Sequence, residues 1–168
     1  MSQSTTNRLS LVWESGWLMH SIRTAVAAAV SLAVASLLSM PEAYWATVST
    51  LIVMQSTLGA AWAISKHRLA GTALGATLGG LTANFFGPVP LVLGVGIFVL
   101  GLICGLLRIH QSAYRFACIT FTIITIVNRA EVPVVIAVHR CIEVSIGIAV
   151  ALALTGLWPG RELKSGTL

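Results

Sequence analysis

The sequence predicts an all-α integral membrane protein, built as a bundle of six transmembrane helices. Of the 168 residues, 57% are hydrophobic and only 9% are charged, and the mean hydropathy is +0.91. Soluble domains carry about 25% charged residues, so five acidic and ten basic side chains are too few to cover a soluble particle of this size. Charged and turn residues divide the chain into six apolar segments of nearly the length that a helix needs to cross a bilayer.

The first three predicted spans cover residues 22–40, 43–64 and 69–86. Pro41 ends the first span, because proline cannot continue a helix. The basic run 66–68 ends the second, since charges avoid the hydrocarbon region. A turn signal, Gly87-Pro88, ends the third.

The last three predicted spans cover residues 89–107, 112–127 and 134–158. Arg108 ends the fourth span, the fifth is short and rich in threonine, and Pro159-Gly160 ends the sixth. The chain is therefore expected to consist of a cytoplasmic, interfacial segment (1–21), a membrane domain (22–158) and a cytoplasmic tail (159–168). No stretch remains for a soluble domain.

Basic residues are distributed unevenly between the two predicted sides of the membrane. With the N-terminus in the cytoplasm, the inner segments hold eight lysines and arginines, whereas the outer loops hold only Arg129. Cytoplasmic loops carry an excess of basic residues, so both termini of this multi-pass chain are expected in the cytoplasm.

Several classes of function are excluded because the sequence lacks the residue types or motifs that they need. The chain has no aspartate, no phosphate-binding GxxxxGK[ST] loop and no HExxH or GxSxG motif, so no enzyme is expected. The basic residues are scattered, which argues against nucleic-acid binding. The three cysteines form no CxxC pair and the four histidines lack ligand spacing on one helix face, so no metal or cofactor is expected.

Two segments 72 residues apart share a pattern. Arg68 opens the third span and Arg140 opens the sixth, and each is followed seven residues later by a glycine, Gly75 or Gly147. Three spans per copy would give the two copies opposite orientations, as in the inverted repeats of secondary transporters. The alternative is that starts of helices share arginine and glycine by chance.

Three glycines recur every fourth residue on one face of the third span: Gly71, Gly75 and Gly79. Small residues at this spacing let helix backbones approach closely within a membrane. We expect close helix packing here, with a moving helix as the alternative.

Glu143 is the outstanding polar residue within the predicted spans. It follows Arg140 by three residues, which places both side chains on one helix face. Charged groups in hydrocarbon are costly and normally face protein or water. The pair is interpreted as an anion site at Arg140 beside a proton-carrying carboxyl at Glu143, and the alternative is a structural ion pair.

Four further residues are candidate substrate contacts. Arg68 lies at the inner end of the third span, where it either binds an anion or anchors the interface. Gln55, near the middle of the second span, either binds substrate or joins helices. Tyr44 and Trp45 either line an outer vestibule or belong to the aromatic belt.

Three stretches together resemble a known family. They are Tyr44-Trp45-Ala46 leading to Val53-Met54-Gln55, the Arg-x-x-Gly-Thr-x-x-Gly run from Arg68, and Arg140-x-x-Glu143 leading to Leu157-Trp158-Pro159. In this order they resemble the membrane domain of the fusaric acid resistance and aromatic acid exporter family. The resemblance covers about residues 20–160.

This resemblance implies a six-helix domain of the bacterial inner membrane that moves organic anions, chiefly aromatic carboxylates, out of the cytoplasm. Typical exporters of the family resemble two such units with cytosolic domains, so a homodimer or a partner membrane subunit is expected. The first hypothesis is therefore an exporter driven by an ion gradient, such as that of protons. A passive organic-anion channel and a non-transporting membrane subunit are the alternatives.

Overall fold

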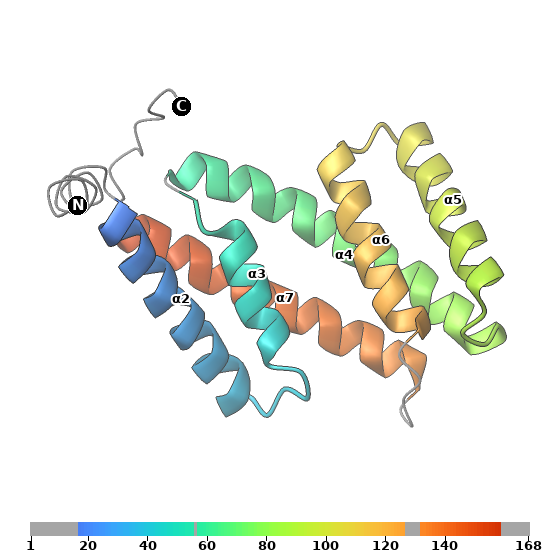
Figure 1. Cartoon of the computed structure of the whole chain (residues 1–168), viewed down its shortest axis with the longest axis horizontal. Helices are drawn as coiled ribbons and strands as arrows, with labels where there is room; N and C mark the ends of the chain where they lie inside the picture. The colour runs from blue at the N-terminus through green and yellow to red at the C-terminus, as the bar shows by residue number, and fades with distance from the viewer. Residues whose placement is uncertain (1–16, 56, 127–131, 159–168) are drawn as a thin grey trace, which may run out of the picture.

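The computed structural model describes residues 17–55, 57–126 and 132–158, and these form six α-helices and no strand (Figure 1). The predicted all-α fold is confirmed for these residues. The helices are α2 (Trp17–Leu37), α3 (Tyr44–Val53), α4 (Leu58–Phe85), α5 (Pro90–Leu106), α6 (Gln111–Ile126) and α7 (Pro133–Leu157). Within the described ranges, α2 and α7 are the two helices that are long and apolar enough to cross a membrane by length and composition.

The predicted second span, residues 43–64, is not one helix. Helix α3 ends at Val53, the backbone of Met54 is extended, and α4 begins at Leu58. Thr57 starts the new helix, because its side chain accepts a hydrogen bond from the Ala60 amide at 3.3 Å and so satisfies a free donor of the first turn. The prediction of a continuous second span was therefore wrong.

Helix α4 joins the end of that predicted span to the whole of the third. It has 28 residues and includes the basic run 66–68 in its interior. Lysine and arginine are good helix formers, so charge alone does not end a helix. The basic run therefore marks a change in polarity along α4, and the helix continues through it.

The ends of α2 and α5 are set by the backbone. Helix α2 (Trp17–Leu37) includes the last five residues of the predicted interfacial segment (1–21), whose residues 1–16 lie outside the described residues. Ser39 follows α2 and Arg108 follows α5, and both adopt positive φ angles, 54° and 51°. A left-handed residue is a common helix terminator, since it turns the next amide back onto the helix carbonyls.

The two longest helices, α4 and α7, pack against each other and cross the molecule (Figure 1). Helix α6 packs on α4 and helix α3 packs on α7. Helix α2 then contacts α3 and α7, and α5 contacts α6 and α4. Each long helix is thus covered by a short helix from the other half of the chain.

The outward faces of the helices are apolar. Leu37, Leu91 and Leu106 are at least three-quarters exposed, and the buried side of α2 is a narrow stripe of residues four apart. Soluble monomers rarely expose continuous apolar surface of this kind. The described helices therefore bury charged side chains in the interior and expose apolar side chains on the outside.

Candidate functional site

Three charged side chains from distant parts of the sequence meet between α7 and the turn before α3. The Arg140 guanidinium donates to Glu42 Oε2 at 2.8 Å and lies 3.8 Å from Glu143 Oε2. Glu143 Oε1 accepts a hydrogen bond from the Glu42 amide at 2.9 Å. The predicted pair of Arg140 and Glu143 is thus joined by a second carboxylate, Glu42, which the sequence analysis did not identify.

Two aromatic residues complete this group. The Arg140 guanidinium lies over the Trp45 ring, 4.0 Å from its centre. Tyr44 donates its hydroxyl hydrogen to Glu42 Oε1 at 2.7 Å, although the Tyr44 side chain is half exposed. A guanidinium over an indole face is stabilised by the ring quadrupole, most strongly where water is excluded. The structure therefore places Tyr44 and Trp45 around the Arg140 cluster, defined as Arg140, Glu143, Glu42, Tyr44 and Trp45.

Arg68 has a different environment. Its side chain is 5% exposed, it donates to Ser49 Oγ at 3.1 Å, and its guanidinium lies 5.0 Å from the centre of the Phe116 ring. Among the described residues, no carboxylate lies within ion-pair distance of Arg68, and its buried Nε has no hydrogen-bond partner. Burying a cation without a counter-charge is costly, which marks this position as a candidate anion site.

One turn of α3 connects the two arginines. Ser49 follows Trp45 by four residues and donates its hydroxyl hydrogen to the Trp45 carbonyl at 2.8 Å. Arg68 therefore contacts the residue that lies one turn from the ring beneath Arg140. A movement of this turn would therefore change the contacts of both guanidinium groups.

Close packing of α3 on α7 sets this geometry. A Cβ atom at Gly147 would overlap the Ala46 carbonyl and the Ser49 side chain. Thr50 Oγ1 lies 3.0 Å from both the Gly147 and the Ala46 carbonyl oxygens, so its hydroxyl joins the two helices. Gly147 lies one helical turn after Glu143 on α7. Its contact with α3 therefore places Glu143 next to the turn that carries Glu42.

The predicted packing glycines all lie on α4 against α6. A Cβ atom at Gly71 or Gly75 would overlap the carbonyl oxygen of Ala113 or Ala117, respectively. Gly79 has more room, since its Cβ would lie 3.2 Å from Ile124 Cβ. These contacts hold Arg68 near Phe116 on α6.

The structure does not bring Gln55 to the two arginines. Gln55 lies in the break between α3 and α4, and its side-chain amide nitrogen is 3.4 Å from the Ile52 carbonyl oxygen. Its backbone carbonyl accepts a hydrogen bond from Arg23, which also donates to the Trp158 carbonyl at 2.8 Å. Arg23 is fully buried and was missed by the sequence analysis, which counted it only as an inner positive charge.

The family of the chain follows from a comparison of its sequence. The profile of the family described as fusaric acid resistance protein-like matches residues 26–154, which is most of the chain and includes both arginines. The chain belongs to this family. The predicted resemblance is thereby confirmed, and the protein is a membrane protein of the fusaric acid resistance protein-like family.

Three relatives are similar to this fusaric acid resistance-like protein. Inner membrane protein YeeA of Escherichia coli is 27% identical over 147 residues, which are 86% of this chain and 42% of YeeA. The uncharacterized protein slr1298 of Synechocystis is 27% identical over 82% of this chain and 18% of its own length. The uncharacterized protein ORF2 of Neisseria gonorrhoeae is 29% identical over 90% and 37%, respectively. The chain thus matches less than half of each relative, and no solved structure gives a significant match.

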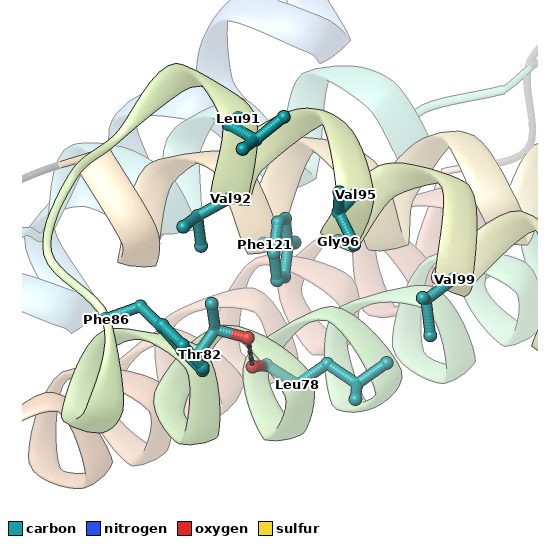
Figure 2. A pocket seen from close by; sticks show the side chains of 9 residues that line it. All are labelled: Leu78, Thr82, Phe86, Leu91, Val92, Val95, Gly96, Val99 and Phe121. Atoms are coloured by element: carbon teal, nitrogen blue, oxygen red, sulfur yellow. Dashed lines mark hydrogen bonds between the residues drawn. The ribbon is translucent and has the colours of Figure 1, made fainter.

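The fusaric acid resistance-like protein also has an apolar pocket of about 290 Å³ between α4, α5 and α6 (Figure 2). Phe121 and Gly96 lie at its centre, and Thr82, whose hydroxyl donates to the Leu78 carbonyl at 2.7 Å, is the one polar side chain among the nine described residues that line it. Among the described residues, neither the Arg140 cluster nor any arginine lines it. The pocket is therefore separate from the candidate anion site.

Proposed function

We propose that this fusaric acid resistance-like protein is a secondary transporter of the bacterial inner membrane that exports aromatic or other organic carboxylates. The observation that carries the proposal is the contrast between Arg68 and Arg140, two of the three buried arginines among the described residues. Arg140 is held by two carboxylates, whereas Arg68 has a hydroxyl and an aromatic ring as its partners. A buried guanidinium without a carboxylate is suited to accept the carboxylate of a substrate.

The surroundings of Arg68 suit an aromatic acid. The Arg68 guanidinium, positioned by Ser49, offers hydrogen bonds to carboxylate oxygens, and Phe116 and Trp45 supply aromatic rings on neighbouring helices. Ligand sites combine apolar walls with a few placed polar groups that fix orientation. Gln55 is not assigned to this site, and Tyr44 acts through Glu42.

We assign proton coupling to the Arg140 cluster, with Glu143 as the proton carrier. Glu143 is 1% exposed and shares Arg140 with Glu42. Of the two carboxylates, Glu143 is the more deeply buried and lies within a helix, so we assign it as the group that takes up and releases the proton. An intramembrane carboxyl of this kind is typical of proton-driven transporters. No catalytic reaction, cofactor or nucleic acid is part of the proposal.

We propose that the six helices form two inverted three-helix repeats, α2–α4 and α5–α7, with both termini in the cytoplasm. The helix contacts support this, because every contact remains a contact when α2, α3 and α4 are exchanged with α5, α6 and α7. The ends of α2 and α5 agree as well. The Met40 amide bonds to the Ala35 carbonyl, and the Ile109 amide bonds to the Cys104 carbonyl, each across a left-handed residue.

Two features of this arrangement support a transporter. Secondary transporters often place the substrate between inverted repeats, beside helices that are interrupted within the membrane. The break between α3 and α4 is an interruption of this type, and α3, which carries Ser49 and Trp45, packs on the long helix of the other repeat. Because the relatives are longer, we propose that the working unit is a homodimer or includes a partner subunit.

Flux in reconstituted vesicles tests the proposal. Purified protein is assayed for benzoate transport with and without an imposed pH gradient, beside Arg68→Gln and the matched control Arg115→Gln on the exposed face of α6. Saturable flux that follows the gradient and is lost only in Arg68→Gln is expected. Flux that is indifferent to the gradient would identify a passive channel, and wild-type flux retained in Arg68→Gln would contradict the assignment of Arg68.

A further inference from the structure

We infer that Glu42 is a tethered carboxylate that occupies, at Arg140, the position that a substrate carboxylate takes at Arg68. The inference rests on the proposed role of Arg68 as the anion site. On this reading, Glu42 does more than form an ion pair: it excludes the substrate carboxylate from Arg140, whose surroundings match those of Arg68.

The first step is that the two arginine sites are equivalent in detail. Arg68 on α4 lies over Phe116 on α6, and Arg140 on α7 lies over Trp45 on α3. Phe116 and Trp45 are 71 positions apart and the arginines are 72 apart. Each site therefore places an arginine from the long helix of one half over an aromatic ring from the middle helix of the other half.

The second step is that the glycine contacts repeat in the same register. Gly75 lies against the carbonyl of Ala117, the residue after Phe116, and Gly147 lies against the carbonyl of Ala46, the residue after Trp45. The arginine, the aromatic ring, the glycine and the alanine thus make the same contacts at the same sequence offsets in both sites. Each position in one site can therefore be assigned to a position in the other.

The third step concerns the residues three positions away from these pairs. On the long helices, Gly71 corresponds to Glu143, and on the middle segments Ala113 corresponds to Glu42. The corresponding positions are again in contact, since Gly71 lies against the Ala113 carbonyl and the Glu143 carboxylate accepts a hydrogen bond from the Glu42 amide. Among the described residues, the equivalent positions therefore provide two carboxylates at Arg140 and none at Arg68.

The fourth step distinguishes the two carboxylates. Glu143 is 1% exposed within α7, and its Oε2 lies 3.8 Å from Arg140. Glu42 is 14% exposed, lies on the turn between α2 and α3, and makes the shorter contact of 2.8 Å. Glu42 is therefore the carboxylate that can leave Arg140 by rotation of a side chain, and a substrate carboxylate that reaches Arg140 must replace it.

Benzoate binding tests this inference. The full chain in lipid nanodiscs is dialysed to equilibrium against radiolabelled benzoate, and bound benzoate is counted per chain for wild type and Glu42→Ala. Glu42→Gln, which keeps the size of the side chain and removes its charge, is a second variant in case the alanine variant does not fold. Glu162→Gln, outside the described residues, makes the same change of net charge and is the control.

We expect wild type and Glu162→Gln to bind a single benzoate, and both Glu42 variants to bind a second one that is lost in Glu42→Ala/Arg140→Gln. A Glu42 variant that stays at the wild-type level overturns the inference and leaves the proposed function intact. If wild type binds none and the Glu42 variants gain an Arg140-dependent site, Glu42 does exclude benzoate from Arg140, but the proposed role of Arg68 fails and the equivalence of the two sites is overturned with it. Absence of benzoate from every variant also overturns the inference.

Discussion

The Arg140 guanidinium lies 2.8 Å from the Glu42 carboxylate, although the two residues are 98 positions apart in the sequence. This contact ties the interior of α7 to the turn that leads into α3. Because Arg140 is 2% exposed, the charges interact in a low-dielectric environment, where an uncompensated charge is costly. The ion pair therefore links α7 to the turn before α3. Substitution of either residue alone removes one charge of this buried pair.

We expect Arg140→Gln to destabilise the protein by about 3–5 kcal/mol, because it leaves two carboxylates without their cation. Thermal unfolding in detergent, followed by circular dichroism, measures the loss. The double variant Glu42→Gln/Arg140→Gln removes one of the stranded charges and should recover part of the stability. An Arg140→Gln protein that melts at the wild-type temperature would show that the cluster is not held by charge.

The membrane class and the principal arginines could be predicted from the sequence, because both depend on local patterns. Composition indicates lipid exposure, and a spacing of three places Arg140 and Glu143 on one helix face whatever the fold. Glu42 could not be assigned in this way, since its partner is fixed only when α3 packs on α7. Its position just before Tyr44-Trp45, in a chain with five acidic residues, was the available signal.

The break between α3 and α4 was missed for a different reason. The hydropathy of residues 43–64 is continuous, so a criterion of length and apolarity joins the two helices. Ser56-Thr57 is a helix-start signal inside that segment, and Thr57 is indeed the N-cap of α4. The extended backbone at Met54 leaves carbonyl groups that need donors, and Arg23 supplies one from α2 to the Gln55 carbonyl.

We expect Gly75→Ala to destabilise the protein by about 1–3 kcal/mol, because the added Cβ overlaps the Ala117 carbonyl of α6. Gly59→Ala is the matched control, since no atom of the described residues lies within 4 Å of a Cβ built there and alanine favours the helix. Thermal unfolding and size-exclusion chromatography compare the two variants. Equal stability of both would contradict close packing of α4 on α6.

We expect Arg23→Gln to loosen the break between α3 and α4. Arg23 donates to the carbonyls of Gln55 and Trp158, and the shorter glutamine side chain cannot reach both. Hydrogen–deuterium exchange should rise at residues 52–60 and at the end of α7, while exchange in α6 stays unchanged. Arg115→Gln, an exposed position, is the control, and an unchanged exchange pattern in Arg23→Gln would refute this role.

We expect Ser49→Ala to weaken binding of benzoate about tenfold, because the hydroxyl that positions Arg68 is lost, and hydrogen bonds to charged groups contribute roughly 1.5–3 kcal/mol. Ser145→Ala is a close control. Both serines donate to a helix carbonyl four residues earlier, at 2.8 Å for Ser49 and 2.7 Å for Ser145, but only Ser49 also accepts from an arginine.

The readout is the concentration dependence of benzoate flux in vesicles. A positioning role for Ser49 predicts a higher KM with a similar maximal rate, since the guanidinium charge remains while its orientation relaxes. Ser145→Ala should keep both values, because its side chain is exposed on α7. If both variants lower the maximal rate equally with unchanged KM, the Ser49 hydroxyl serves only the helix, and Arg68 is held in place by Phe116 and the packing of α4.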